Sequence, residues 1–267
     1  MHIAFEKYHG AGNDFIMIDN RNLPFDATNH KLIKSLCDRH FGIGADGLIL
    51  LEKSETSQFK MIYYNADGKP GSMCGNGGRC AVAFANKLRI INENSAVLFD
   101  AADGLHKAFI ISSEYLGSAV VRLGMQDVNT IESGLDYFYL NTGSPHYVIF
   151  THDIDKIDVK KEGSTIRYNQ RFNSDGTNVN FAESANHKIK VRTYERGVED
   201  ETLACGTGVT AVAIASAFKE NQRGEITKQI QAKGGLLTVS FKSDGNRFSK
   251  VFLEGPAEYV FTGIVNV

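Results

Sequence analysis

Two stretches of the sequence decide the fold: SMCGNGGRCAVAFA at residues 72–85 and LACGTGVTAVAIA at residues 203–215. In each stretch a cysteine directly precedes a Gly-X-Gly turn, and the turn opens a run of small apolar residues. The runs are apolar nearly all round, and a helix without a polar face is a buried one. Each stretch therefore predicts a helix enclosed by its own half of the chain.

The segments before the two stretches also correspond. YYNADG at residues 63–68 matches TYERG at residues 193–197, and about half of the 267-residue chain separates the two cysteines. A duplication accounts for both observations. We expect an α+β protein of two pseudo-symmetric domains, each a mostly antiparallel sheet or barrel wrapped around a central buried helix. The first would cover residues 1–117 with a C-terminal return at 263–267, the second 118–262, and the two cysteines would face each other across a cleft.

Other apolar runs predict the remaining elements. A helix is expected from Thr28, its N-cap, to Arg39, with an apolar face made by Leu32, Ile33, Leu36 and Cys37. Short runs rich in β-branched and aromatic residues, bounded by Gly, Asn or Asp, predict strands. These runs are residues 15–19, 48–51, 59–64, 119–123, 137–140, 147–150, 189–194, 236–241 and 251–253.

The composition excludes several classes of protein. Hydrophobic residues make up 42% and charged residues 22%, which is ordinary for a soluble domain, and the net charge of -2 gives no basic excess for nucleic acid. We see no signal peptide and no run of about 18 apolar residues, so we expect a cytoplasmic protein without a membrane partner. The four cysteines show neither CxxC nor zinc-finger spacing, so free thiols are expected, and no metal.

The paired cysteines suggest a reaction. A glycine turn at a helix start presents backbone N–H groups without intrahelical partners, and the helix dipole adds positive charge there. Such a turn binds anions and lowers the pKa of a nearby thiol. Two facing turns would clamp one carboxylate and place a thiol on each side of the neighbouring carbon. One thiolate could then remove the α-proton while the other thiol returns one, which inverts the stereocentre.

Other interpretations of the two stretches stay open at this point. A cysteine in such a place can be a buried, inert residue. The turns could bind phosphate, although the Walker lysine is absent. Cys74 and Cys205 could also form the disulfide of a thiol redox protein, or belong to a module that binds anions without catalysis. Exchange of the substrate's α-hydrogen with solvent distinguishes an epimerase from the last two.

Four motifs carry a resemblance that runs nearly end to end. They are HGAGNDFIMID at residues 9–19, DRHFGIGADGLILL at 38–51, YNADGKPGSMCGNGGRC at 64–80 and YERGVEDETLACGTG at 194–208. Together they resemble the diaminopimelate epimerase family. The resemblance implies that Cys74 and Cys205 exchange the α-proton without pyridoxal phosphate or another cofactor. It implies interconversion of LL- and meso-diaminopimelate, for lysine and peptidoglycan synthesis in a bacterial cytoplasm. Family members are commonly homodimers, which these residues do not decide.

The same resemblance implies further site residues. His146, which resembles a family histidine near the first cysteine and could tune that thiol, and Glu195 would assist catalysis. Glu195 and Arg196 would hold the distal ammonium and carboxylate of the substrate. The other residues implied to bind substrate are Asn13, Asn65 and Asn178 through their side chains, and Gly75, Asn76, Gly206 and Thr207 through their N–H groups. We expect His9, Cys37 and Cys80 to be structural.

Two positions depart from the family pattern. Ser144 precedes Pro145 and His146 where many members have asparagine, and Gly47 stands where some have glutamine. Both bear on how the distal end of the substrate is held. Two related enzyme types compete with the epimerase. The distal ligands in YERG and Asn65 argue against a proline racemase type, and the two cysteines argue against an isomerase of the phenazine-biosynthesis type.

Overall fold

The computed structural model describes residues 2–22, 25–172, 174–185 and 188–267. These residues form two compact units. The first comprises residues 1–123 and 255–267, and the second comprises residues 124–254. The boundaries differ from those expected at 117 and 263. In the first unit, Ala119–Gly124 pairs with the preceding strand, and the last strand pairs with the first strand from Glu258 onward.

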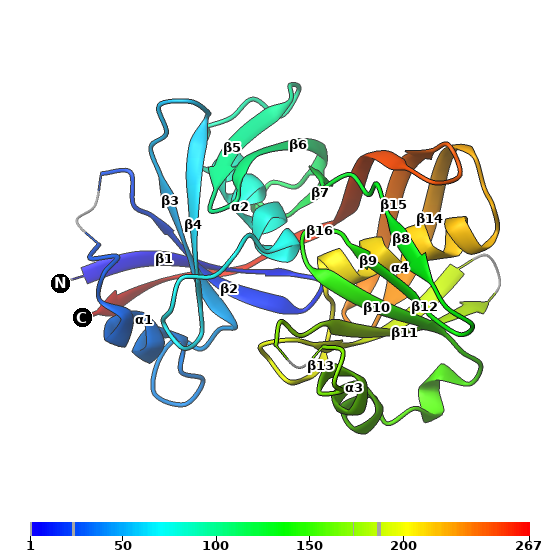
Figure 1. Ribbon diagram of the computed structural model, residues 1–267. Helices are drawn as coiled ribbons and strands as arrows, with labels where there is room; N and C mark the ends of the chain where they lie inside the picture. The colour runs from blue at the N-terminus through cyan, green and yellow to red at the C-terminus, as the bar shows by residue number, and fades with distance from the viewer. Residues whose placement is uncertain (1, 23–24, 173, 186–187) are drawn as a thin grey trace. The chain divides into compact units, whose positions relative to one another are not determined.

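The first unit is a closed barrel of eight strands (Figure 1). The barrel closes because β1 pairs with β2 on one side and with β16 on the other. In spatial order the strands are β1 (His2–Gly10), β2 (Asn13–Asp19), β3 (Gly47–Glu52), β4 (Phe59–Asn65), β5 (Val97–Ala101), β6 (Gly104–Ser113), β7 (Ala119–Gly124) and the last part of β16 (Phe248–Asn266).

The second unit repeats this design. In spatial order its strands are the first part of β16, then β15 (Gly235–Ser243), β14 (Gly224–Ala232), β12 (Lys188–Glu195), β11 (Asn178–Ala185), β10 (Pro145–Phe150), β9 (Phe138–Asn141) and β8 (Ile131–Ser133). The short β13 (Asp200–Thr202) pairs with β12. A bridge between Val128 and Phe248 joins the segment before β8 to β16.

Strand pairing confirms the predicted duplication. From β1 to β7 the pairs run antiparallel, parallel, antiparallel, parallel, antiparallel and antiparallel. The same order recurs from β9 to β16. In each unit a helix links each parallel pair, as crossover connections require. These helices are α1 (His30–Cys37) and α2 (Gly75–Lys87) in the first unit, and α3 (Val159–Arg167) and α4 (Gly206–Lys219) in the second.

The helices α2 and α4 are the cores of their units, as their sequences predict. Residues 75–85 of α2 are all buried, and so are residues 206–217 of α4 except Thr207. The helix α2 contacts β1, β2, β3, β4 and β6, while α4 contacts β9, β10, β11, β12, β14 and β15. Gly77 shows how closely α2 packs, because a Cβ there would lie 2.9 Å from Ile49 Cδ1.

All the predicted strands exist, but other elements were missed. They are β1, β5, β6, β8, β11, β13, β14, α3 and the 3₁₀ turn Ile154–Lys156. The prediction of Thr28 as N-cap is wrong: Asn29 caps α1, because its side chain accepts from the N–H of Leu32. Ile33, Leu36 and Cys37 form the buried face of α1 as expected.

We predict that the α4 core carries much of the stability of the second unit. Ile214→Ala removes a fully buried side chain, so it should lower the free energy of unfolding by about 2–5 kcal/mol. Lys31→Ala, at an exposed position of α1, should change it by less than about 0.5 kcal/mol. Urea denaturation measures both. Equal effects of the two substitutions would contradict a large contribution of the α4 core to stability.

Candidate functional site

Each predicted catalytic cysteine is the N-cap of its buried helix. Cys74 and Cys205 have extended backbone, with φ, ψ of -108°, 122° and -110°, 111°. Their carbonyls accept the first helical hydrogen bonds, from Gly78 and Val209. Neither side chain caps its helix. The N–H groups of the first helical residues, Gly75 and Gly206 among them, therefore retain the anion-binding character of a helix start.

In the first unit, the side-chain oxygen of Asn13 faces the sulfur of Cys74. The thiol donates to Oδ1 of Asn13 at 3.6 Å, and the amide of Asn76 donates to the same oxygen at 3.2 Å. The Asn13 amide nitrogen donates to Asp46 at 2.7 Å. A carboxylate accepts only, so Asp46 fixes the orientation of Asn13 and turns its oxygen toward the sulfur.

An ionic network holds Asp46 and Asn13 in place. The buried Lys7 lies 2.7 Å from Asp14 and donates to the carbonyl of Gly44. Arg39 binds Asp14 through two nitrogens and reaches Asp46 at 2.7 Å. Burial on its own raises the pKa of Asp14, but the hydrogen bonds and charges of Arg39 and Lys7 outweigh it and hold that pKa well below its usual range.

Arg79 fixes Asn76 from the other side. It is fully buried in α2 and donates to Oδ1 of Asn76 at 3.0 Å, and to the carbonyls of Gly75 and Pro256 at 3.3 Å. Burial lowers its pKa, while the charges of Cys80 and Cys74 act in the opposite direction. Because Arg79 takes the oxygen of Asn76, the nitrogen of that amide is left to face Asn13.

In the second unit, Cys205 begins a different chain of hydrogen bonds. Its sulfur lies 3.4 Å from Oγ1 of Thr207, and that hydroxyl lies 2.9 Å from Nε2 of His146. Nδ1 of His146 lies 3.0 Å from the amide nitrogen of Asn180. The hydroxyl of Thr142 donates to the backbone carbonyl of Thr207 at 2.8 Å and secures the turn.

His146 is neutral in this setting. It lies on β10 and is fully buried. Burial, aided by the charge of Arg196, lowers the pKa of His146 to about 3. The histidine that the family resemblance places near the first cysteine is therefore joined instead to Cys205, through Thr207.

The remaining predicted residues of this unit lie at the starts and ends of strands. Asn178 is buried at the start of β11, where its oxygen accepts from the N–H of Arg196 at 2.9 Å and its nitrogen donates to the carbonyl of Pro145 at 3.1 Å. Glu195 ends β12 and accepts from the hydroxyl of Thr202. The exposed Arg196 donates to the carbonyl of Asp175 at 2.6 Å.

The two departures from the family pattern lie in different surroundings. A Cβ at Gly47 would lie 2.5 Å from the ring of Tyr63, and a Cβ at Gly71 equally close, so this ring packs between the two glycines. It leaves no room for a glutamine at position 47. Gly47 also pairs with Asn65, which is exposed at the end of β4. The carbonyl of Ser144 accepts from the N–H of Thr142.

The other two cysteines are core residues in the structure. Cys37 and Cys80 are buried free thiols, and burial raises the pKa of both, to about 12 for Cys37. His9 is half-buried, and its Nδ1 accepts from the N–H of Gly12.

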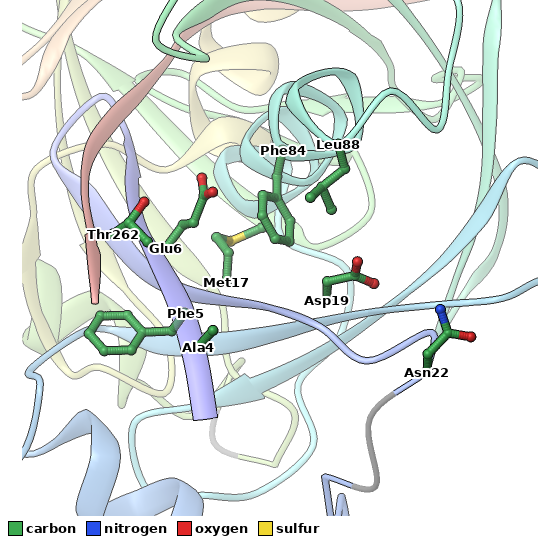
Figure 2. A pocket seen from close by; sticks show the side chains of 9 residues that line it. All are labelled: Ala4, Phe5, Glu6, Met17, Asp19, Asn22, Phe84, Leu88 and Thr262. Carbon is green, nitrogen blue, oxygen red and sulfur yellow. The ribbon is translucent and has the colours of Figure 1, made fainter. Parts of the chain in front are cut away.

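A cavity of about 290 Å³ in the first unit lies away from Cys74 (Figure 2). Phe84 and Leu88, near the end of α2, line it with residues of β1, β2 and β16. Since α2 rises about 1.5 Å per residue, roughly 20 Å of helix separates Leu88 from Cys74. The predicted site residues of this unit do not line the cavity.

Two classes of feature are absent from the described residues. They contain no group of three or more His, Cys, Asp or Glu side chains that could hold a metal ion. None of their helices is long and apolar enough to cross a bilayer.

Sequence reasoning missed Asn180 and Asp46. Asn180 lies two positions after Asn178 on β11, so the two side chains share a face of the strand, and this spacing could have identified it. Asp46 lies in the quoted ADGL motif, but its link to Asn13 crosses from one parallel strand to its neighbour. Only the strand register reveals such a pair.

Comparison with known proteins places the chain in a family. The family model for Diaminopimelate epimerase matches residues 5–114 and 138–260. The chain belongs to the diaminopimelate epimerase family. The diaminopimelate epimerase of Flavobacterium psychrophilum is 51% identical over 257 residues, which cover 96% of this chain and 97% of the relative. The diaminopimelate epimerase of Chlorobaculum tepidum is 44% identical over 265 residues, 97% of this chain and 99% of the relative.

Solved structures outside the diaminopimelate epimerase family share its fold. A phenazine biosynthesis protein of the PhzF family from Bacillus anthracis gives a TM-score of 0.76 at 14% identity, with both chains fully covered. A probable proline racemase from Agrobacterium radiobacter gives 0.73 at 15% identity, with 99% of this chain and 92% of that chain covered. The predicted fold class is therefore confirmed.

We predict that His146 makes stability depend on pH. Its pKa is near 6.5 when unfolded and about 3 when folded, so the neutral form stabilises the fold above pH 6.5. As the pH falls below 6.5, this contribution should shrink by about 1.4 kcal/mol per pH unit. Urea unfolding at pH 7, 6 and 5 should show a steeper decline for the wild type than for His146→Gln. Parallel declines would contradict a neutral buried imidazole.

Proposed function

We propose that this protein is an epimerase that interconverts LL- and meso-diaminopimelate by exchange of the α-proton, without pyridoxal phosphate. One observation carries the proposal. Each of two duplicated units begins its buried helix with a cysteine followed by a Gly-X-Gly turn. Family membership supports the substrate, since the relatives named above are diaminopimelate epimerases.

The chemistry needs both parts of this motif. The α-hydrogen of an amino acid is a much weaker acid than a thiol, so removing it requires stabilisation of the negative charge that develops on the carboxylate. Backbone donors at a helix start are suited to this, and one well-placed donor is worth roughly 3–4 kcal/mol. The N–H groups of Gly75, Asn76, Gly206 and Thr207 would supply them.

The two sulfurs would divide the proton transfer. One acts as a thiolate that takes the α-proton from one face of the carbon, and the other acts as a thiol that delivers a proton to the opposite face. The roles reverse in the other direction, so no cofactor is consumed. Closure of the two units over the substrate would exclude water and strengthen the donors.

The distal end of the substrate needs charged and amide ligands. A guanidinium binds a carboxylate with two parallel hydrogen bonds, so Arg196 would take the distal carboxylate and Glu195 the distal ammonium. Asn13, Asn65 and Asn178 would complete the site, because an amide can both donate and accept. This set distinguishes diaminopimelate from an amino acid without a charged end.

Solvent deuterium tests the proposal directly. Purified protein incubated with LL-diaminopimelate in D₂O should give the meso product with deuterium at the inverted carbon. Chiral chromatography with mass spectrometry measures product and label together. Unlabelled, unconverted substrate would favour a redox switch or an anion-binding module, and exchange in proline but not in diaminopimelate would favour the racemase type.

Single cysteine substitutions test whether both sulfurs take part in proton transfer. Cys74→Ala and Cys205→Ala should each lower epimerisation in both directions by roughly 100- to 10,000-fold, the range expected for one proton-transfer group. Cys37→Ala is the matched control, because it removes a buried thiol from α1. Full two-way turnover by either variant would exclude the two-base reaction.

We also propose that the enzyme is cytoplasmic and a homodimer. The last part of β16 exposes Val260, Phe261 and Ile264, apolar side chains that a second copy of the chain could cover. Sedimentation velocity at micromolar concentration should give the mass of two chains, and a mass near 29.4 kDa would contradict the dimer.

A further inference from the structure

A chain of buried polar side chains ends at Cys205, and its members have definite donor and acceptor roles. Asn180 and His146 are fully buried, and Thr193 is nearly so. Buried polar groups require partners, so the direction of each hydrogen bond constrains the next one. The direction can be followed from a backbone carbonyl to the sulfur.

The orientation of the Asn180 amide comes first. Its nitrogen donates to the backbone carbonyl of Tyr147 at 3.3 Å, and its oxygen accepts from the hydroxyl of Thr193 at 3.0 Å. A backbone carbonyl only accepts, so the amide nitrogen must lie on that side. The same nitrogen lies 3.0 Å from Nδ1 of His146 and donates to it.

The tautomer of His146 follows. Because Nδ1 accepts from Asn180, it carries no hydrogen, and in a neutral imidazole the hydrogen is then on Nε2. Nε2–H therefore donates to Oγ1 of Thr207 at 2.9 Å. If the ring were protonated, the Nδ1–H of His146 would point at the N–H of Asn180. This repulsion and the burial of the ring both disfavour the charged form of His146.

The hydroxyl of Thr207 completes the chain. Its oxygen already accepts from His146, so its own hydrogen is available to the sulfur of Cys205 at 3.4 Å. We propose that Asn180 is a positioning residue which, through the tautomer of His146, makes the Thr207 hydroxyl donate to Cys205 and so stabilises the thiolate form of Cys205.

The first unit has the opposite polarity. Asp46 and Asn76 turn the oxygen of Asn13 toward Cys74, and an amide oxygen cannot donate. Asn13 therefore stabilises the protonated thiol of Cys74.

Two charged groups lie at the end of β12, next to the hydrogen-bond chain. Glu195 ends this strand, and Arg196, whose charge acts on His146, follows it. These two charges have opposite signs and are common to all the variants below. The effect of a substitution at Thr207 or Asn180 on the labelling midpoint therefore measures the contribution of the hydrogen-bond chain.

The inference deepens the proposed function but can be tested without substrate. The rate of iodoacetamide labelling at each cysteine, followed by peptide mass spectrometry across pH, gives the pH midpoint of each thiolate. Thr207→Val should raise the Cys205 midpoint by about one pH unit, a roughly tenfold slower reaction at pH 7, and leave Cys74 unchanged.

Thr207→Ser is the matched control, because it keeps the hydroxyl and should retain the wild-type midpoint. A Cys205 midpoint unchanged in folded Thr207→Val would overturn the proposal. If the protein lacks epimerase activity but shows these midpoints, the proposed function fails and the inference stands.

The tautomer gives a second readout that does not depend on Thr207→Val folding. In protein labelled with ¹⁵N-histidine, NMR should show the hydrogen of His146 on Nε2, with the signals assigned by their loss in His146→Gln. Asn180→Leu removes the donor without adding a charge, so it should release the Nε2–H tautomer and raise the Cys205 labelling midpoint. A wild-type hydrogen on Nδ1 would overturn the proposal.

Discussion

The burial of one helix on all sides is the constraint on which both units depend. A helix such as α4, which is buried from Gly206 to Ala217 apart from Thr207, must be covered on all sides, and a sheet covers it only by curling around it. In the first unit the sheet closes completely, through the pairing of β1 with β16. The helix start is then the one part of the helix where polar backbone groups remain to bind a ligand.

The cysteine position follows from this constraint. A serine or aspartate at an N-cap accepts a hydrogen bond from the helix and so occupies its donors. Cys74 and Cys205 make no such bond in their helices, which leaves the first N–H groups to a carboxylate and the sulfur to a proton. Glycines beside them admit close approach: a Cβ at Gly208 would lie 2.4 Å from the oxygen of Asn180.

The sequence predicted the parts of the structure that local patterns determine. Both buried helices, their N-terminal cysteines and the duplication follow from short motifs. The strand β1 was missed because the buried Lys7 interrupts its apolar alternation, and only the ion pair with Asp14 makes that burial tolerable. Asn180 was missed because its importance depends on His146, a residue on the neighbouring parallel strand.

A duplicated scaffold need not give its two copies the same chemistry. Strand order, helix placement and cysteine position repeat, but the side chain beside each sulfur does not. An asparagine oxygen faces Cys74 and a threonine hydroxyl lies near Cys205. The two helix starts are therefore the same kind of anion site with unequal neighbours, since the Thr207 hydroxyl can donate to Cys205 whereas the Asn13 oxygen can only accept from Cys74.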